Sequence, residues 1–442
     1  MKINREILRL AVPNILSNVS VPLAGMIDVA IMGHMGSVKY LAAIAVGGMI
    51  FSFIYWNFGF LRMGTTGLAA QAFGKADHTE ASLVLGRATF FGLVIALLLI
   101  MLQWPIEQLS FWAFDMPEAE KAEAIIYFRI RIWAAPATMM LLVLNGWFIG
   151  MQNSVFPTVV TIVLSIVNVA ANFFFVYVVG MKTEGVAMGT VIAQYIGLIL
   201  ALLLFFIRYR NYIKIISTRK ILLRDAMRKF LSINFDIFIR TFLLVLVLTF
   251  FTWASGHYFG TTILAVNTVL FQFFLFFSHF VDGFAYAGEA LTGRVIGMKS
   301  SRLLKIIAKR LLLIGALISV AFSLIFIFFA EPIVMVITDV QYIIDMASTY
   351  YFWIAIVPLI SFAAFIWDGI YIGATASKAM RNSMLIAALG LFFPVFYLTK
   401  DFFDNHSLWL AFVVFLFSRG LLLWRLRKKE VYSRVYFFYL SK

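Results

Sequence analysis

The chain has 442 residues, of which 63% are hydrophobic and only 13% are charged. A soluble domain carries about 25% charged residues, so this composition excludes an ordinary water-soluble protein and indicates a chain whose solvent is lipid. The net charge of +15 is typical of basic cytoplasmic loops and does not predict a nucleic-acid partner, and the lack of cysteine excludes disulfides and thiolate metal sites.

Long apolar segments follow one another along the chain, separated by short polar turns. Twelve are predicted, at 7–32, 42–72, 82–104, 122–149, 156–180, 186–207, 228–254, 262–292, 306–330, 344–373, 383–399 and 407–424. Crossing a membrane takes about 20 apolar residues in a helix. The first segment has no small-residue cleavage site, so we interpret it as a membrane span and not as a signal peptide. An even number of spans places both termini on one side.

The charges between the spans predict the orientation. With the N-terminus in the cytoplasm, the inner segments hold 26 Lys/Arg and 5 Asp/Glu, whereas the outer loops hold 4 Lys/Arg and 11 Asp/Glu. A missing span would exchange the two sides after it and erase this asymmetry. The pattern therefore favours twelve spans in the cell (inner) membrane, with both termini cytoplasmic.

The sequence repeats itself at an offset of 223 residues. Gly33-His34 matches Gly256-His257, and NGWFIG at 145–150 matches DGIYIG at 368–373. Parallel repeats of this kind are typical of secondary transporters, which hold the substrate between the halves. We predict an N-lobe over 1–207, a basic cytoplasmic linker over 208–229 and a C-lobe over 230–442.

One acid lies inside the first span. Asp28 follows Pro13 and Pro22, and proline loosens a helix because it removes a backbone donor. An acid on a helix that can bend suits an ion-coupling site. The alternative is a structural acid that is satisfied by an arginine or by the backbone.

Amides and hydroxyls accompany this acid in the N-lobe. Asn168 and Asn172 are four residues apart and share a helix face, and Asn145 and Thr190 lie in the neighbouring spans. Ordinary hydrogen bonds between helices remain the alternative for each of them. At the repeat offset, the C-lobe has apolar residues in place of the acid and the two fifth-span amides: Phe251, Leu391 and Val395.

The C-lobe has its own charged residues within the spans. They are Asp236, Arg240, Asp282, Glu289 and Asp368. The four-residue spacing of Asp236 and Arg240 permits an ion pair, and the seven-residue spacing of Asp282 and Glu289 places both on one helix face. A structural network and a substrate site both remain open for this set.

The sequence contains no nucleotide-binding motif. Gly288 and Gly293 have a spacing near that of a P-loop, but the Lys-Ser/Thr pair is missing. We expect neither an ATP motor nor an enzyme, and no cofactor.

The chain contains, in this order, IDVAIMGHMGSVKYLAAIAVG, GTTGLAAQAFGKAD, LNGWFIGMQNS, NFDIFIRTFLLV, DGFAYAGEALTGRVIG and WDGIYIGATASKAMRNSM. These segments resemble the DinF-like branch of the multidrug and toxic compound extrusion (MATE) family, from Ile7 to about Trp424. The resemblance implies an all-α integral membrane protein with six helices in each of two lobes, forming a V-shaped antiporter. Members export cationic, amphipathic compounds with a proton or sodium gradient.

The resemblance also assigns roles to residues of the N-lobe. It implies that Asp28 is the acid of the first helix, that Pro13 is the proline where this helix bends, and that Thr190 is the hydroxyl of the sixth helix. Asn145 and Asn168 match polar residues that line the cavity.

Asn172 departs from the pattern of the branch, which usually has aspartate at this position. Two acids together would share a proton or hold Na⁺ with two charges. Here Asp28 remains as the single carboxylate, and the oxygens of Asn168, Asn172 and Thr190 would complete a Na⁺ site with less charge. We favour protons as the coupling ion.

These observations predict a monomeric antiporter in membrane lipid that exports cationic, amphipathic small molecules in exchange for H⁺ or Na⁺ by alternating access. The alternative is a flippase for lipid-linked precursors from the same broad superfamily, which would need a wide basic cavity. A membrane enzyme or receptor would need a nucleophile, a metal cluster or an extramembrane domain, and the sequence shows none.

Overall fold

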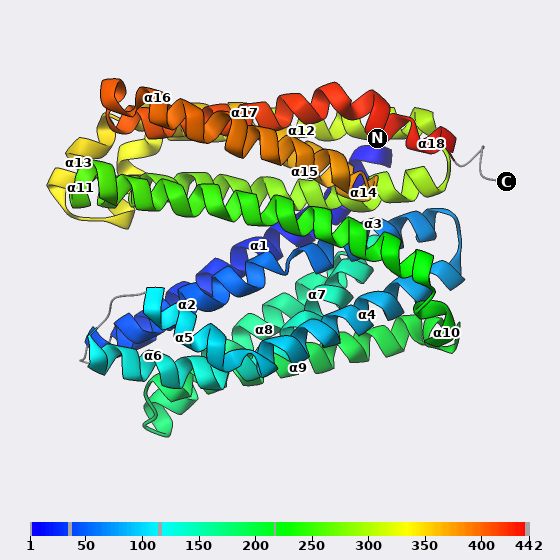
Figure 1. Ribbon diagram of the computed structural model, residues 1–442, viewed down its shortest axis with the longest axis horizontal. Helices are drawn as coiled ribbons and strands as arrows, with labels where there is room; N and C mark the ends of the chain where they lie inside the picture. The colour runs from blue at the N-terminus through cyan, green and yellow to red at the C-terminus, as the bar shows by residue number, and fades with distance from the viewer. Residues whose placement is uncertain (1, 34–37, 114–116, 216–217, 438–442) are drawn as a thin grey trace. The chain divides into compact units, whose positions relative to one another are not determined.

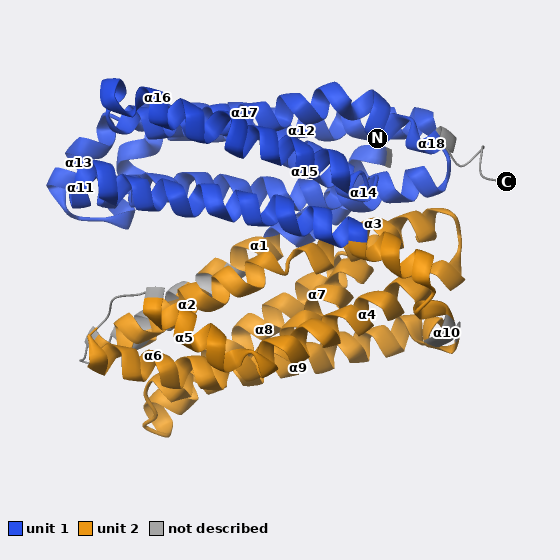
Figure 2. Ribbon diagram, in the orientation of Figure 1, with its two compact units in different colours: residues 1–15, 232–442 blue, residues 16–231 orange. Residues whose placement is uncertain are grey.

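The computed structural model describes residues 2–33, 38–113, 117–215 and 218–437, and every regular element in these ranges is a helix. The chain forms two compact units (Figure 2). Unit 1 comprises residues 1–15 and 232–442, and unit 2 comprises residues 16–231.

The helices of unit 2 begin with the larger part of α1 and continue to the start of α11 (Figure 1). They are α1 (Lys2–Gly33), α2 (Val38–Asn57), α3 (Phe60–Gly74), α4 (His78–Met101), α5 (Gln103–Ala113), α6 (Glu118–Arg131), η1 (Ile132–Ala134), α7 (Ala135–Gly150), α8 (Val155–Phe173), η2 (Phe174–Val178), α9 (Thr183–Tyr209), η3 (Arg210–Ile215) and α10 (Thr218–Ile221).

Unit 1 contains most of α11 and all later helices. They are α11 (Arg224–Gly297), α12 (Ser301–Ile337), α13 (Gln341–Ser348), α14 (Tyr351–Gly373), α15 (Ser377–Leu385), η4 (Ile386–Phe392), α16 (Phe393–Phe403), α17 (Asn405–Arg427), η5 (Lys428–Tyr432) and α18 (Arg434–Phe437).

The predicted spans all coincide with helices. Ten stretches of the described chain are long and apolar enough to cross a membrane, and α11 counts as one of them. This 74-residue element changes direction at Gly260, whose φ of 87° lies in the left-handed region that favours glycine, so it provides two spans. Together with α1, twelve spans result, which confirms the predicted all-α membrane fold.

Helix α1 is shared between the two units. Its first 15 residues belong to unit 1, where Glu6 pairs with Arg294, and a Cβ atom on Gly283 would lie only 2.3 Å from the side chain of Ile15. The division after Ile15 comes two residues after Pro13. The helix is continuous through Pro13 and Pro22, so it shows no break at either proline.

The repeated glycine motif marks the closest helix crossing in each unit. In unit 2, a Cβ atom on Gly146 of α7 would lie 2.4 Å from the backbone oxygen of Arg62 on α3. In unit 1, a Cβ atom on Gly369 of α14 would lie 2.2 Å from the backbone oxygen of Ala285 on α11. The motif is therefore repeated because both crossings bring two backbones together, which only glycine permits.

The segment predicted as a linker packs on unit 2. Tyr212 of η3 is hydrogen-bonded to Nδ1 of His78 at 2.8 Å, and its ring lies edge-on to Trp147. Trp147 itself donates to the backbone oxygen of Ala81. Aromatic packing thus holds the start of the linker against α4 and α7.

Candidate functional site

A buried pair of polar side chains joins α8 and α9. The amide nitrogen Nδ2 of Asn168 donates to Oγ1 of Thr190 at 3.1 Å, and the threonine hydroxyl donates in turn to the backbone oxygen of Val186 at 3.0 Å. Both side chains are buried. The hydrogen bond leaves the carbonyl oxygen of Asn168 as an acceptor for another group or a cation.

Asn172 lies one helical turn further along α8 and is fully buried. A Cβ atom on Gly189 of α9 would lie 2.0 Å from its Oδ1 atom, so only glycine admits this amide. Because Gly189 precedes Thr190, the structure brings Asn168, Asn172 and Thr190 into one cluster, as their spacing predicted.

The backbone of Asp28 reaches the same level of unit 2, but its side chain lies outside the part of the chain that the structure describes. Helix α1 follows α8, because Ser17 donates to Thr158 at 3.1 Å and Tyr177 donates to the backbone oxygen of Ile31 at 3.3 Å. At about 1.5 Å per residue, Asp28 comes about 16 Å after Ser17. Asn168 comes about 15 Å after Thr158 and Asn172 about 21 Å after it, so Asp28 falls between them.

Asn145 occupies a different place. It lies on α7 beside Gly146, at the close crossing with α3, and its Oδ1 atom is buried without a hydrogen bond. Within the described residues, no contact joins it to the Asn168–Thr190 pair.

The charged residues of unit 1 form two ion-pair groups. In the first, Oδ2 of Asp368 accepts from Nη1 of Arg240 at 2.8 Å and from Nη2 of Arg419 at 2.5 Å. All three side chains are buried. One carboxylate is therefore held by two guanidinium groups from α11 and α17.

The second group is centred on Asp236. Its Oδ1 atom accepts from Arg381 at 2.7 Å, and its Oδ2 atom accepts from Ser377 at 2.9 Å. The structure thus pairs Asp236 and Arg240 with different partners, although their spacing permits a pair with each other. Arg381 and Arg419 were counted as cytoplasmic bases, but Arg419 falls inside the last apolar segment, which was a signal of burial.

The two remaining acids of unit 1 lie on the second arm of α11. Glu289 is buried at the crossing with α14, where a Cβ atom on Gly373 would lie 2.4 Å from the backbone oxygen of Glu289. Asp282 is half-buried, seven residues earlier.

The described residues contain no group of three His, Asp or Glu side chains that would hold a metal ion. A sodium site in unit 2 would therefore depend on the amide and hydroxyl oxygens of the α8–α9 cluster, together with the carboxylate of Asp28.

The chain matches the MatE family model twice, over residues 13–174 and again over residues 237–398. It belongs to the MatE family. The starts of the two matches differ by close to the 223 residues of the internal repeat, so each six-helix half corresponds to one MatE domain. Members of the MatE family are membrane transporters, and the chain is accordingly an integral membrane transporter and not an enzyme.

Curated relatives from the MatE family span nearly the whole chain. DNA damage-inducible protein F of Escherichia coli (strain K12) is 35% identical over 429 residues, which are 96% of this chain and 92% of that protein. This similarity confirms the resemblance to the DinF-like branch. The probable multidrug resistance protein NorM of Thermotoga maritima is 21% identical over 364 residues, or 78% of this chain and 75% of that protein.

Solved MATE structures share the fold. A MATE protein in the bent conformation superposes with a TM-score of 0.89 at 16% identity, over 100% of this chain and 98% of that chain. An outward-facing multidrug resistance MATE family transporter of the MOP superfamily gives 0.87 at 17% identity, over 98% and 96% of the two chains.

Proposed function

We propose that the chain exports cationic, amphipathic compounds in exchange for protons, with Na⁺ as the alternative coupling ion. The observation that supports this most is the buried α8–α9 cluster of unit 2, at the level of the acid on α1. Two relatives, from Thermotoga maritima and Neisseria meningitidis, are named as probable multidrug resistance proteins, which supports the substrate class.

The coupling step follows from the charge of a single carboxylate. Ionised Asp28 attracts a cationic compound, and a proton that neutralises it removes this attraction and releases the compound. An uncompensated charge within a bilayer costs about 2.5–3.5 kcal/mol or more. Asp28 therefore holds either the substrate or a proton when the site is closed to water.

The conformational step uses Pro13. The part of α1 before this proline belongs to unit 1 and the part after it to unit 2, and proline leaves the helix without one backbone hydrogen bond. Bending at Pro13 lets the acid-bearing part of α1 move with unit 2, while Glu6 remains paired with Arg294.

The protein acts as a monomer in the cell (inner) membrane, with both termini in the cytoplasm. The distribution of basic residues between alternate loops supports this orientation.

The test is transport by Asp28→Asn in proteoliposomes. A proton gradient drives ethidium transport in the unchanged protein, and Asp28→Asn is expected to lose at least about tenfold of this rate, because it neither binds a proton nor attracts a cation. Asp225→Asn is the control, since Asp225 is an exposed acid at the start of α11. Full gradient-driven transport by Asp28→Asn rejects the mechanism.

A flippase for lipid-linked precursors is the second candidate. A MOP superfamily transporter from Pyrococcus furiosus is described as having a binding pocket of reverse polarity, and this chain superposes on it with a TM-score of 0.84 at 16% identity. In this chain, however, Arg240 and Arg419 are buried and share Asp368, so they do not form an open basic surface. Movement of a fluorescent lipid-linked saccharide across the vesicle bilayer, without ethidium transport, would favour the flippase.

A further inference from the structure

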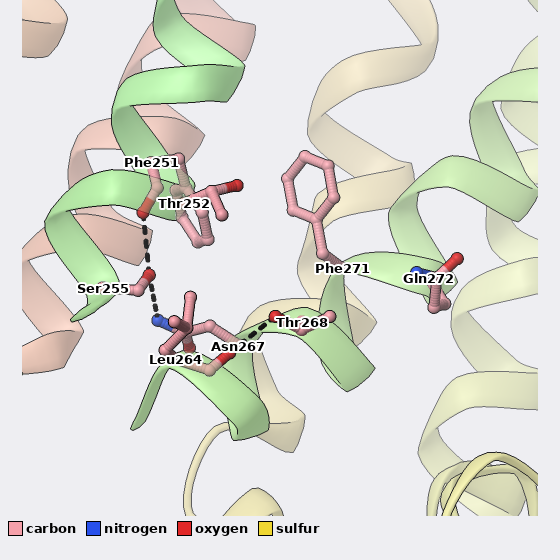
Figure 3. A pocket seen from close by; sticks show the side chains of 8 residues that line it. All are labelled: Phe251, Thr252, Ser255, Leu264, Asn267, Thr268, Phe271 and Gln272. Atoms are coloured by element: carbon pink, nitrogen blue, oxygen red, sulfur yellow. Dashed lines mark hydrogen bonds between the residues drawn. The ribbon is translucent and has the colours of Figure 1, made fainter. Parts of the chain in front are cut away.

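A cavity of about 180 Å³ lies within unit 1, between the two arms of α11 that meet at Gly260 (Figure 3). Phe251, Thr252 and Ser255 line it from the first arm. The second arm contributes five lining residues, from Leu264 to Gln272. The cavity plays no part in the coupling site proposed above.

The floor of the cavity is a polar group without free hydrogen-bonding capacity. Nδ2 of Asn267 donates to Ser255 at 2.8 Å and to Asn405 at 2.7 Å. Its Oδ1 atom accepts from Asn405 at 3.0 Å and from Trp409 at 2.9 Å. Since both hydrogens and both lone pairs are used, the floor is rigid and requires neither water nor a ligand to satisfy it.

Two aromatic rings form the walls. The rings of Phe251 and Phe271 have centroids 5.3 Å apart, and Phe251 is held from behind by Trp409, at 5.1 Å. Phe251 is fully buried, whereas Phe271 is half-buried and turns toward the open side (Figure 3). Such walls favour a flat aromatic group, which packs against ring faces and edges.

The rim offers acceptors for hydrogen bonds. The hydroxyl of Thr268 donates to the backbone oxygen of Leu264 at 2.6 Å, and that of Thr252 donates to Leu248 at 3.3 Å. Their single hydrogens are used, so their oxygens face a ligand as acceptors. Gln272 adds an amide to the rim.

The exposure of the rim indicates which solvent it meets. Thr252, Thr268 and Gln272 are exposed although they lie within membrane spans. Polar side chains at membrane depth face a water-filled path in preference to lipid, because lipid provides no hydrogen-bond partners. A ligand would therefore enter the cavity from water.

We propose that this cavity is a subsite for one aromatic ring of the transported compound, a ring that carries an N–H or O–H donor. Its size suits one ring, because an apolar cavity of about 150 Å³ binds benzene, whereas whole drug-sized ligands occupy about 300–1,000 Å³. The described residues that line it include no charged side chain, so the charge of the compound is met elsewhere. The proposal rests on the proposed function only in taking the ligand to be the exported amphipathic compound.

The first test uses the natural lack of cysteine. Gln272→Cys places a single thiol on the rim, and its reaction with N-ethylmaleimide reports access to the cavity. Ethidium, which has fused aromatic rings and aromatic amines, is expected to slow labelling at least about fivefold, whereas tetraethylammonium, a cation without a ring, leaves it unchanged. Thr261→Cys is the control, because Thr261 is exposed on the same helix but does not line the cavity.

The second test fills the cavity. Thr268→Phe is expected to raise the Kd of ethidium about tenfold, measured by fluorescence on the purified protein, because the ring of the ligand is excluded. Thr261→Phe is the matched control and keeps the original affinity. The melting temperatures of both variants show whether the fold is retained.

The outcomes separate this inference from the proposed function. If the protein transports ethidium, but ethidium neither protects Gln272→Cys nor loses affinity in Thr268→Phe, the subsite is rejected and the antiport mechanism stands. If ethidium protects the thiol while no ion gradient drives its transport, the subsite stands and the antiport mechanism fails. Equal protection by tetraethylammonium would overturn the assignment of an aromatic ligand.

Discussion

At the scale of single residues, the amide at position 172 offers the sharpest experiment. Asn172 is buried beside Gly189 and has nearly the shape of aspartate, so Asn172→Asp adds a charge with little change in volume. We expect this variant to depend more strongly on Na⁺, because two carboxylates compensate a cation better than one. The measurement is the initial rate of ethidium transport with Na⁺ replaced by choline.

Asn145→Asp serves as the control for this experiment, since Asn145 is also a membrane-embedded amide but lies outside the α8–α9 cluster. An Asn172→Asp protein with the ion response of the unchanged protein would argue against a role of this cluster in ion coupling.

The acids of unit 1 also show how residue spacing and residue contacts differ. Spacing along α11 permits a pair between Asp236 and Arg240, but Asp236 contacts Arg381 and Arg240 contacts Asp368. A buried charge is retained only with a partner of good geometry, and such partners come from α14, α15 and α17. The sequence therefore identified most of the charged residues and left their pairing open.

At the scale of helices, the two glycine crossings determine how closely the spans pack. Gly146→Ala is expected to cost about 1–3 kcal/mol of stability, because its Cβ atom would meet the backbone of Arg62 and force the helices apart. The readout is the thermal unfolding of the purified protein in detergent.

Gly48→Ala is the matched control, because nothing lies within 4 Å of a Cβ atom at this position of α2. It is expected to be neutral or slightly stabilising, since alanine favours a helix over glycine by about 0.5–1 kcal/mol. Equal loss of stability in both variants would show that the close crossing of α3 and α7 is not the cause.

At the scale of the whole molecule, the orientation in the membrane is open to a direct test. Met298 and Val340 are similarly exposed, at 51% and 49%, and they follow and precede α12 on opposite sides of the predicted membrane. In the cysteine-free chain, a membrane-impermeant maleimide added to intact cells is expected to label Val340→Cys and to leave Met298→Cys unlabelled.

Disruption of the cells should make Met298→Cys reactive as well, which shows that its thiol is accessible. Labelling of Met298→Cys alone in intact cells would reverse the proposed orientation.

The sequence by itself determined the number of spans and the parallel repeat, and it predicted the orientation. Lipid imposes a length and an apolar composition on each segment, and the flanking charges act locally, so these properties can be read one segment at a time. The grouping of Asn168, Asn172 and Thr190 was predictable in part, because two of them share a helix face.

Only the tertiary structure decided which side chains meet. The partners of Asp236 and Asp368 lie up to 145 residues away along the chain, and no local periodicity connects them. The assignment of residues 1–15 to unit 1 and the cavity between the arms of α11 likewise depend on how helices cross. Local physical rules specify each helix, whereas contacts between helices depend on the shape of all of them together.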